Sequence, residues 1–121
     1  MTSEALQAAL VVELQHQLSD GVTITECPIV TDIGIRVPDL AWASAEFMNR
    51  HQGRSPLPRA PEICMEVVSS SNVLAEITEK TRAYLAAGAT EVWLVSENGS
   101  IRIVDRSGEK TQSAFPISVQ L

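Results

Sequence analysis

One short segment limits the fold more than any other part of the chain: residues 60–71, which read APEICMEVVSSS. From Ile63 onward, large apolar side chains occupy every second position, the period expected of a β-strand. Apolar segments flank this strand on both sides in the sequence, so we expect it inside a sheet rather than at an edge. The opposite face of the strand then carries Glu62 and Glu66, and buried carboxylates require a partner. The sequence therefore predicts a central strand whose acidic groups lie near a cation or hydrogen-bond donors.

Periodic patterns elsewhere predict two helices and several further strands. An amphipathic helix with leucines at steps of four is expected over residues 3–19, and a second helix over residues 74–87, with Leu74 on its apolar face. Further extended segments, rich in apolar and β-branched residues, are expected at residues 22–26, 33–44, 91–96 and 101–106, and residues 114–121 could add an edge strand. Pro38 interrupts one of them, and Asn98-Gly99 predicts a hairpin turn. The order of these elements predicts an α+β fold, a mixed sheet flanked by helices.

The size and composition fit a single domain covering residues 1–121. Hydrophobic residues make up 45% and charged residues 20%, which excludes a disordered chain. No segment approaches the roughly 20 apolar residues of a membrane span, and the N-terminus lacks a signal-peptide pattern. Cys27 and Cys64 are too isolated for a disulfide framework or a cysteine-ligated metal site. We therefore expect a cytoplasmic protein with no membrane partner.

The distribution of charge bears on nucleic-acid binding. The net charge of −6 argues against a protein that binds nucleic acid through a broad basic surface. A local basic segment nevertheless exists, because Arg50, Arg54 and Arg59 lie within RHQGRSPLPR and no acidic residue separates Phe47 from Pro61. This segment is either a solvated, proline-rich connection or a surface that meets phosphate groups.

Three groups in the sequence could carry chemistry: Asp39 after a proline, Glu66 with Glu62 on the central strand, and Lys80 on the following helix. Carboxylates on neighbouring strands can hold Mg²⁺, which prefers oxygen ligands and keeps several waters. A nearby lysine would complete a set suited to phosphodiester hydrolysis. Each residue also has a structural alternative. Lys80 could form a surface ion pair with Glu76, Asp39 could cap a turn, and Glu62 could be exposed where the strand begins.

Three segments of this chain, VPDLAWAS, PEICMEVVSSS and EKTRAYLAAGATEVWLVS, resemble the Uma-type restriction endonuclease family, a branch of the PD-(D/E)XK nuclease superfamily. The resemblance spans roughly residues 31–105 and implies a restriction-endonuclease-like fold. By position it implies that Asp39 and Glu66 bind a metal ion, Mg²⁺ or Mn²⁺. Most of the superfamily has a lysine two residues after the second acid, but this chain has Val68 there. Lys80, on the helix, would take the place of that lysine.

The resemblance implies a metal-dependent endonuclease that hydrolyses DNA, with Asp39, Glu66 and Lys80 as catalytic residues. Glu62 could support the acidic pair, and the basic segment could contact the phosphate backbone. The chain is short at its N-terminus relative to typical members. A second interpretation is an inactive member of the family that acts as a protein-interaction module and homodimer, and a third is a small-molecule hydrolase that uses the same metal site.

Overall fold

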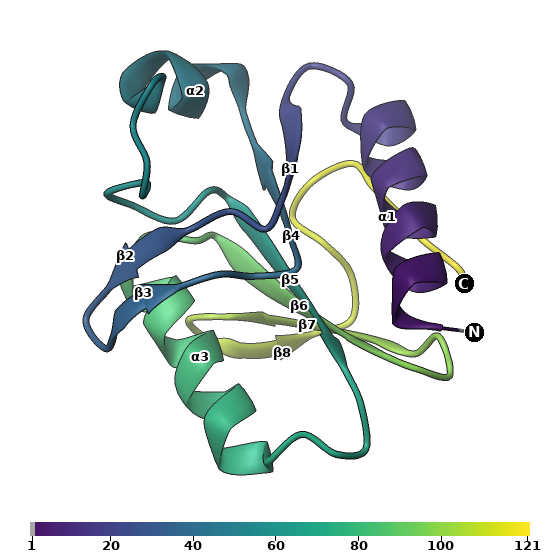
Figure 1. The fold of residues 1–121 in the computed structure, drawn as a ribbon. Helices are drawn as coiled ribbons and strands as arrows, with labels where there is room; N and C mark the ends of the chain where they lie inside the picture. The colour runs from purple at the N-terminus through teal and green to yellow at the C-terminus, as the bar shows by residue number, and fades with distance from the viewer. Residues whose placement is uncertain (1) are drawn as a thin grey trace.

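The computed structural model describes residues 2–121, which form three helices, a six-stranded sheet and a separate two-stranded sheet. The elements follow one another in the order α1 Ser3–Gln17, β1 Val22–Thr25, β2 Ile29–Thr31, β3 Gly34–Arg36, β4 Leu40–Ala43, α2 Ala45–His51, β5 Ile63–Val68, α3 Leu74–Ala86, β6 Glu91–Ser96, β7 Ile101–Asp105 and β8 Gly108–Lys110. The predicted α+β class, a mixed sheet flanked by helices, is confirmed (Figure 1).

The main sheet has the strand order β1-β4-β5-β6-β7-β8, so β5 is an interior strand as predicted. Strands β5 and β6 are parallel, while the other neighbouring pairs are antiparallel. A parallel pair needs a crossover connection, and α3 provides it between β5 and β6. The predicted hairpin between residues 91–96 and 101–106 corresponds to β6 and β7, with Gly99 in the left-handed region at φ 91°.

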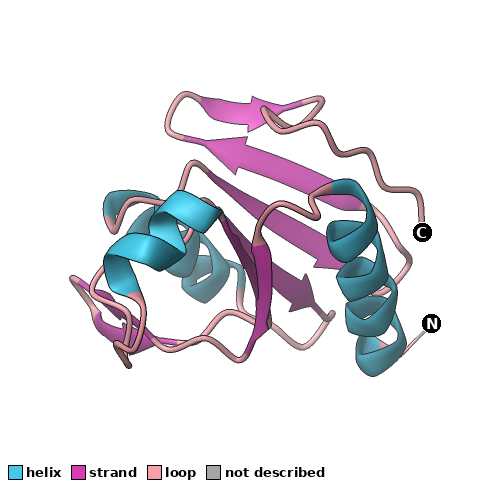
Figure 2. Ribbon diagram, turned by 90° about the horizontal axis from the view of Figure 1, so that it is seen from above, coloured by secondary structure: helices cyan, strands magenta, loops and turns pink. Residues whose placement is uncertain are grey.

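Both faces of the main sheet are covered by apolar packing. On one face, leucines of α1 pack with Ile63 and Met65 of β5. On the other face, Tyr84 of α3 packs in a cluster that includes Cys64 of β5 and Ile29 of β2. Figure 2 shows the sheet from above, with α1 on one side and the other two helices on the opposite side. The face of β5 that carries Glu66 is therefore also part of a core, and the carboxylate of Glu66 sits beside buried apolar groups.

Local sequence explains where the helices begin and end. The hydroxyls of Thr2 and Ser44 accept hydrogen bonds from the backbone N–H groups of Ala5 and Phe47, which caps α1 and α2. The third helix is followed by Gly88, whose φ of +118° favours glycine. A Cβ at this position would also lie 2.7 Å from the guanidinium of Arg59.

Several elements differ from the sequence prediction. Residues 45–51 form helix α2, for which no helix was predicted, and its last two residues, Arg50 and His51, begin the basic segment that was expected to be loop. The segment before Pro38 forms a small antiparallel hairpin, β2–β3, which stands apart from the main sheet. Residues 114–121 form no strand, and β8 is the edge strand instead. Leu74 is 71% exposed because it lies at the first turn of α3, beyond the part of the helix that packs on the sheet.

Of the helices within residues 2–121, none has the length and apolar character that crossing a membrane requires.

Candidate metal centre

Two strands bring the acidic pair together. In the antiparallel register of β4 and β5, Leu40 lies opposite Met65, so the preceding Asp39 lies next to Glu66. The backbone N–H of Asp39 donates to Oε1 of Glu66 at 3.2 Å, and the N–H of Val67 donates to Oδ2 of Asp39 at 2.8 Å. Asp39 therefore bonds across to the neighbouring strand rather than capping a local turn. The sequence-predicted pair lies in one place, where β4 begins beside the middle of β5.

Helix α3 contributes two further groups to this place. Lys80 Nζ lies 3.0 Å from Oε2 of Glu66, and the hydroxyl of Tyr84 donates to the same oxygen at 2.9 Å. The two residues are four positions apart, so they project from the same face of the helix. Within residues 2–121, the only ion pair that includes Lys80 is the one with Glu66. The alternative surface pair between Glu76 and Lys80 is absent from that part of the chain.

The environment of Glu66 disfavours its ionised form. Its side chain is only 12% exposed, and burial raises the pKa of the carboxyl above its usual value. The charge of Lys80 and the hydrogen bonds from Lys80 and Tyr84 act in the opposite direction, whereas the nearby charge of Asp39 raises the pKa further. When both acids are ionised, two carboxylates face one ammonium group. The site then carries one negative charge that a bound cation would balance.

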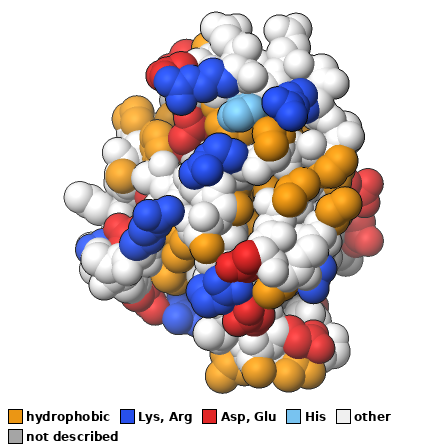
Figure 3. All heavy atoms as spheres, turned by 90° about the vertical axis from the view of Figure 1, so that its left-hand side faces the viewer, with side chains coloured by type: hydrophobic (Ala, Val, Ile, Leu, Met, Phe, Trp, Pro, Cys, Tyr) orange, Lys and Arg blue, Asp and Glu red, His pale blue; other side chains and the backbone are white. Residues whose placement is uncertain are grey.

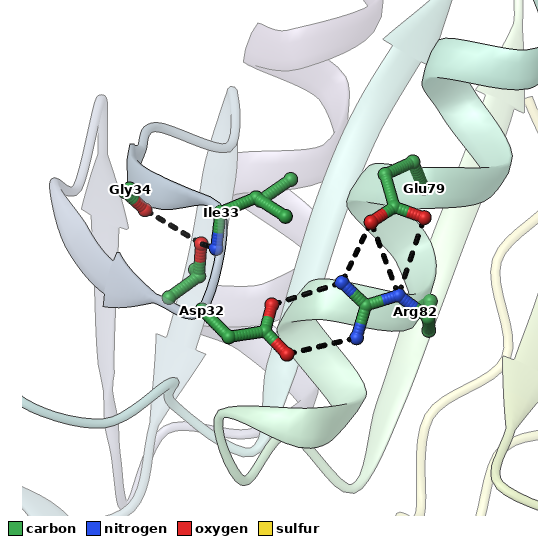
Figure 4. A network of polar contacts seen from close by, with 6 residues as sticks. Asp32, Ile33, Gly34, Glu79 and Arg82 are labelled. Carbon is green, nitrogen blue, oxygen red and sulfur yellow. Dashed lines mark hydrogen bonds and ion pairs between the residues drawn. The ribbon is translucent and has the colours of Figure 1, made fainter.

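A pocket of about 450 Å³ leads to this site. Glu66 and Lys80 line it, together with residues of α3 and of the β2–β3 hairpin. Figure 4 shows how the hairpin is attached to the helix: Arg82 donates two hydrogen bonds to the carboxylate of Asp32, at 2.9 and 3.0 Å, and also binds Glu79. The hairpin thus forms one wall of the pocket, and α3 forms another.

The donors present fit a hard divalent cation held in part by water. Asp39 and Glu66 offer carboxylate oxygens, the ligand type that Mg²⁺ and Mn²⁺ prefer. Within residues 2–121, no three His, Cys, Asp or Glu side chains gather closely enough to hold a metal ion. A cation at this pair would therefore take its remaining ligands from water or substrate, which is usual for Mg²⁺.

The other sequence-predicted residues lie elsewhere. Glu62 precedes Glu66 by four positions, about 13 Å along a strand, and its carboxylate accepts hydrogen bonds from the N–H and hydroxyl of Ser44, at 2.9 and 2.5 Å. It therefore holds the residue that caps α2. Arg50 pairs with Glu46 on the surface, at 2.6 Å, while Arg54 and Arg59 are exposed. All three arginines belong to the segment between β4 and β5.

Two residues of the site had no role assigned from the sequence. Tyr84 is fully buried, and its place in the apolar stripe of α3 gave no sign of the bond to Glu66. The spacing of four residues from Lys80 is the signal that could have indicated it. Arg36 lines the pocket from β3. Its place next to a turn and a proline resembles that of many surface arginines, so the sequence alone held no comparable signal.

Comparison with known proteins identifies a family and a similar fold. No curated protein has a sequence that matches this chain at a significant level. Among solved structures, a protein of Anabaena variabilis ATCC 29413, described as "a putative nuclease belonging to DUF820", is similar with a TM-score of 0.70 at 14% identity. The match covers 98% of this chain and 75% of that one, and at this identity it shows a shared fold. The sequence profile of the Uma2 family, described as "Putative restriction endonuclease", matches residues 2–116, and the chain therefore belongs to that family.

Proposed function

We propose that this protein is a metal-dependent endonuclease that hydrolyses phosphodiester bonds in DNA, with Mg²⁺ or Mn²⁺ held by Asp39 and Glu66. The observation that carries the proposal is the meeting of these two carboxylates, from neighbouring strands, with a single lysine beside a pocket. A half-buried excess of negative charge costs stability unless a cation balances it. Membership of the family and the shared fold support a nuclease reaction.

The residues of the site have distinct roles in this proposal. Asp39 and Glu66 would hold the cation, which when bound polarises a phosphoryl oxygen and lowers the pKa of a water molecule. Tyr84 and the backbone N–H of Asp39 fix the carboxylate of Glu66 from two sides. Lys80 reaches the site from α3, where its ammonium group can stabilise the negative charge that develops on the phosphate or orient the attacking water. It thereby takes over from the absent strand lysine, whose position is occupied by Val68.

Contacts to the rest of the DNA would come from basic groups outside the pocket. Figure 3 shows Lys and Arg side chains around a histidine in the upper part of the face that carries the hairpin and α2. Residues 50–59 contribute Arg50, Arg54 and Arg59, all exposed, and we propose that they bind phosphates away from the scissile bond. Because the net charge is −6, this binding should be weak and should depend strongly on salt.

A cleavage assay on supercoiled plasmid DNA tests the proposal. With 10 mM Mg²⁺ or Mn²⁺ we expect nicked or linear product, and with EDTA none. Glu66→Gln and Lys80→Ala should each lower the rate at least about 100-fold, the usual loss when one charge-stabilising group is removed. Glu97→Gln, an exposed glutamate in the β6–β7 turn, is the matched control and should retain activity. Cleavage that survives Glu66→Gln would contradict the proposed site.

One observation favours a second function, a homodimeric interaction module without catalysis. The β2–β3 hairpin and the residue that follows it expose Val30, Ile35 and Val37, with exposed fractions of 44%, 54% and 43%. Neighbouring exposed apolar side chains often mark a protein interface. This second function predicts a dimer by analytical ultracentrifugation that Ile35→Ser dissociates, together with no cleavage by the native protein in the presence of Mg²⁺.

A further inference from the structure

The pocket beside the acidic pair limits what can reach it. Glu66 lines this pocket and is 12% exposed, so a phosphate group that approaches its carboxylate enters between the β2–β3 hairpin and α3. The volume of about 450 Å³ is in the range of small-molecule sites. One nucleotide fits such a volume, whereas a base-paired duplex does not.

Asn72, Glu76 and Glu79 also line the pocket, but part of its wall is aliphatic and suited to a flat, uncharged ring. Ile33 comes from the hairpin, Val68 from the end of β5, and Ala75 and Ile77 from α3. Aliphatic side chains of this kind can pack against the faces of a nucleobase, since every base has two apolar faces and polar groups only at its edges. A sugar-phosphate backbone alone would gain little from them.

Arg36 is the cation in the pocket that remains available to an anion. Its Nη1 donates to its own neighbour, the carbonyl of Ile35, at 3.0 Å, and none of the ion pairs within residues 2–121 includes it. Lys80 is paired with Glu66, and Arg82 with two acids. The Nη1 atom lies 3.3 Å from the place that a Cβ on Gly34 would occupy, so the guanidinium folds back over the turn of the hairpin.

The hairpin that carries Arg36 is held in place from its other end. The carboxylate of Asp32 accepts a hydrogen bond from each terminal nitrogen of Arg82, and the same guanidinium donates to Glu79, which lies one helical turn earlier (Figure 4). A guanidinium bound in this bidentate way fixes direction as well as distance. The hairpin that carries Arg36 is thus tied to the helix that carries Lys80, and both residues line the same pocket.

We propose that this pocket binds one unpaired nucleotide of a DNA strand, with its phosphate held by Arg36 and its base packed between the hairpin and α3. The substrate class is then single-stranded DNA, or duplex DNA with an unpaired segment, because a paired base must leave the helix to enter. This inference rests on the proposed nuclease function and adds to it the form of DNA that the site accepts.

Fluorescence anisotropy tests the inference with the full chain in Ca²⁺, an oxygen-binding cation used in place of Mg²⁺ to limit hydrolysis. The probes are a fluorescein-labelled 12-nucleotide single strand and a GC-rich duplex of the same sequence. We expect the single strand to bind at least about tenfold more tightly, because its unpaired base can enter the pocket without first leaving a duplex. Arg36→Ala and Arg36→Gln should each weaken single-strand binding about tenfold or more.

The matched control is Arg102→Ala, which removes an exposed arginine of β7 that pairs with Glu109 of β8. It should change the affinity for the single strand less than about twofold. Equal binding of duplex and single strand, equal effects of the two arginine sites, or no binding of either probe would each overturn the inference. The plasmid assay separates this failure from that of the proposed function. Mg²⁺-dependent cleavage without a preference for single strands would support the nuclease function and contradict the nucleotide pocket. Single-strand binding without cleavage would support the pocket and contradict the nuclease function.

Discussion

Removing the hydroxyl of Tyr84 tests whether α3 and the acidic pair form one unit. Tyr84→Phe keeps the ring, which is fully buried, and deletes only the donor that lies 2.9 Å from Oε2 of Glu66. No cavity larger than one oxygen atom results, so the change in stability reports mainly on the hydrogen bond. The same substitution removes an interaction that favours the ionised carboxyl, so the pKa of Glu66, already raised by burial, should rise further.

The expected magnitude follows from the partners that remain. A hydrogen bond to a charged group contributes about 1.5–3 kcal/mol. Glu66 keeps Lys80 and the N–H of Asp39 as partners after the substitution, so we expect the lower end of that range, about 1.5 kcal/mol. For a chain of this length, such a loss lowers the melting temperature by about 5–9 °C.

A double-mutant cycle in EDTA measures the bond itself. Urea unfolding of the native protein, Tyr84→Phe, Glu66→Ala and the double variant gives the coupling between the two side chains. We expect Tyr84→Phe to cost less than about 0.5 kcal/mol when Glu66 is already alanine, a coupling of about 1 kcal/mol. If Tyr84→Phe lowers the unfolding free energy equally in the native protein and in Glu66→Ala, the reasoning is refuted, because the hydroxyl then stabilises the fold through a partner other than Glu66.

Three further predictions concern stability. Burial raises the pKa of the Glu66 carboxyl, so the folded state binds its proton more tightly than the unfolded state. The free energy of unfolding of the native protein in EDTA, compared with that of Glu66→Gln, should therefore fall as the pH rises from 4 through the pKa of Glu66 in the folded state. Urea unfolding at a series of pH values measures this difference. Glu91 is 2% exposed and accepts hydrogen bonds from Trp93, Ser113 and Ala114. Glu91→Ala should therefore lower the unfolding free energy by at least about 2 kcal/mol. A smaller loss would show that these donors bind water instead. Leu74→Gln should change the unfolding free energy by less than about 0.5 kcal/mol, whereas Leu85→Ala on the same helix should cost about 2–5 kcal/mol, and similar values for the two would contradict the observed burial.

The central strand and its acid pair could be predicted because their pattern is local. Alternation from Ile63 identified β5, and its apolar flanks placed it inside the sheet. Asp39 and Glu66 fall on strands that follow one another, and consecutive strands are usually neighbours in a sheet. The structure brings these two residues together by the register of β4 and β5, and it adds Lys80 from the crossover helix.

The elements that escaped prediction depend on contacts between distant segments. Helix α2 has only seven residues, and Glu62, just before β5, accepts hydrogen bonds from its capping Ser44. Strand β2 has three residues and is paired on its outer side by Leu57. The C-terminal tail looks like a strand by composition, yet residues near 113–114 bind the buried carboxylate of Glu91 instead of a strand edge. Such contacts leave no periodic signal in the sequence.

The most direct test of the account is a count of bound Mn²⁺, made by electron paramagnetic resonance on the free ion during titration. We predict one Mn²⁺ per chain, displaced by excess Mg²⁺, with binding that strengthens as pH rises because the carboxyl of Glu66 must lose its proton. Asp39→Asn and Glu66→Gln should each abolish this site, while Glu97→Gln should leave it unchanged. Absence of binding at millimolar Mn²⁺, or equal binding by all four proteins, would contradict the claim that Asp39 and Glu66 hold a catalytic cation.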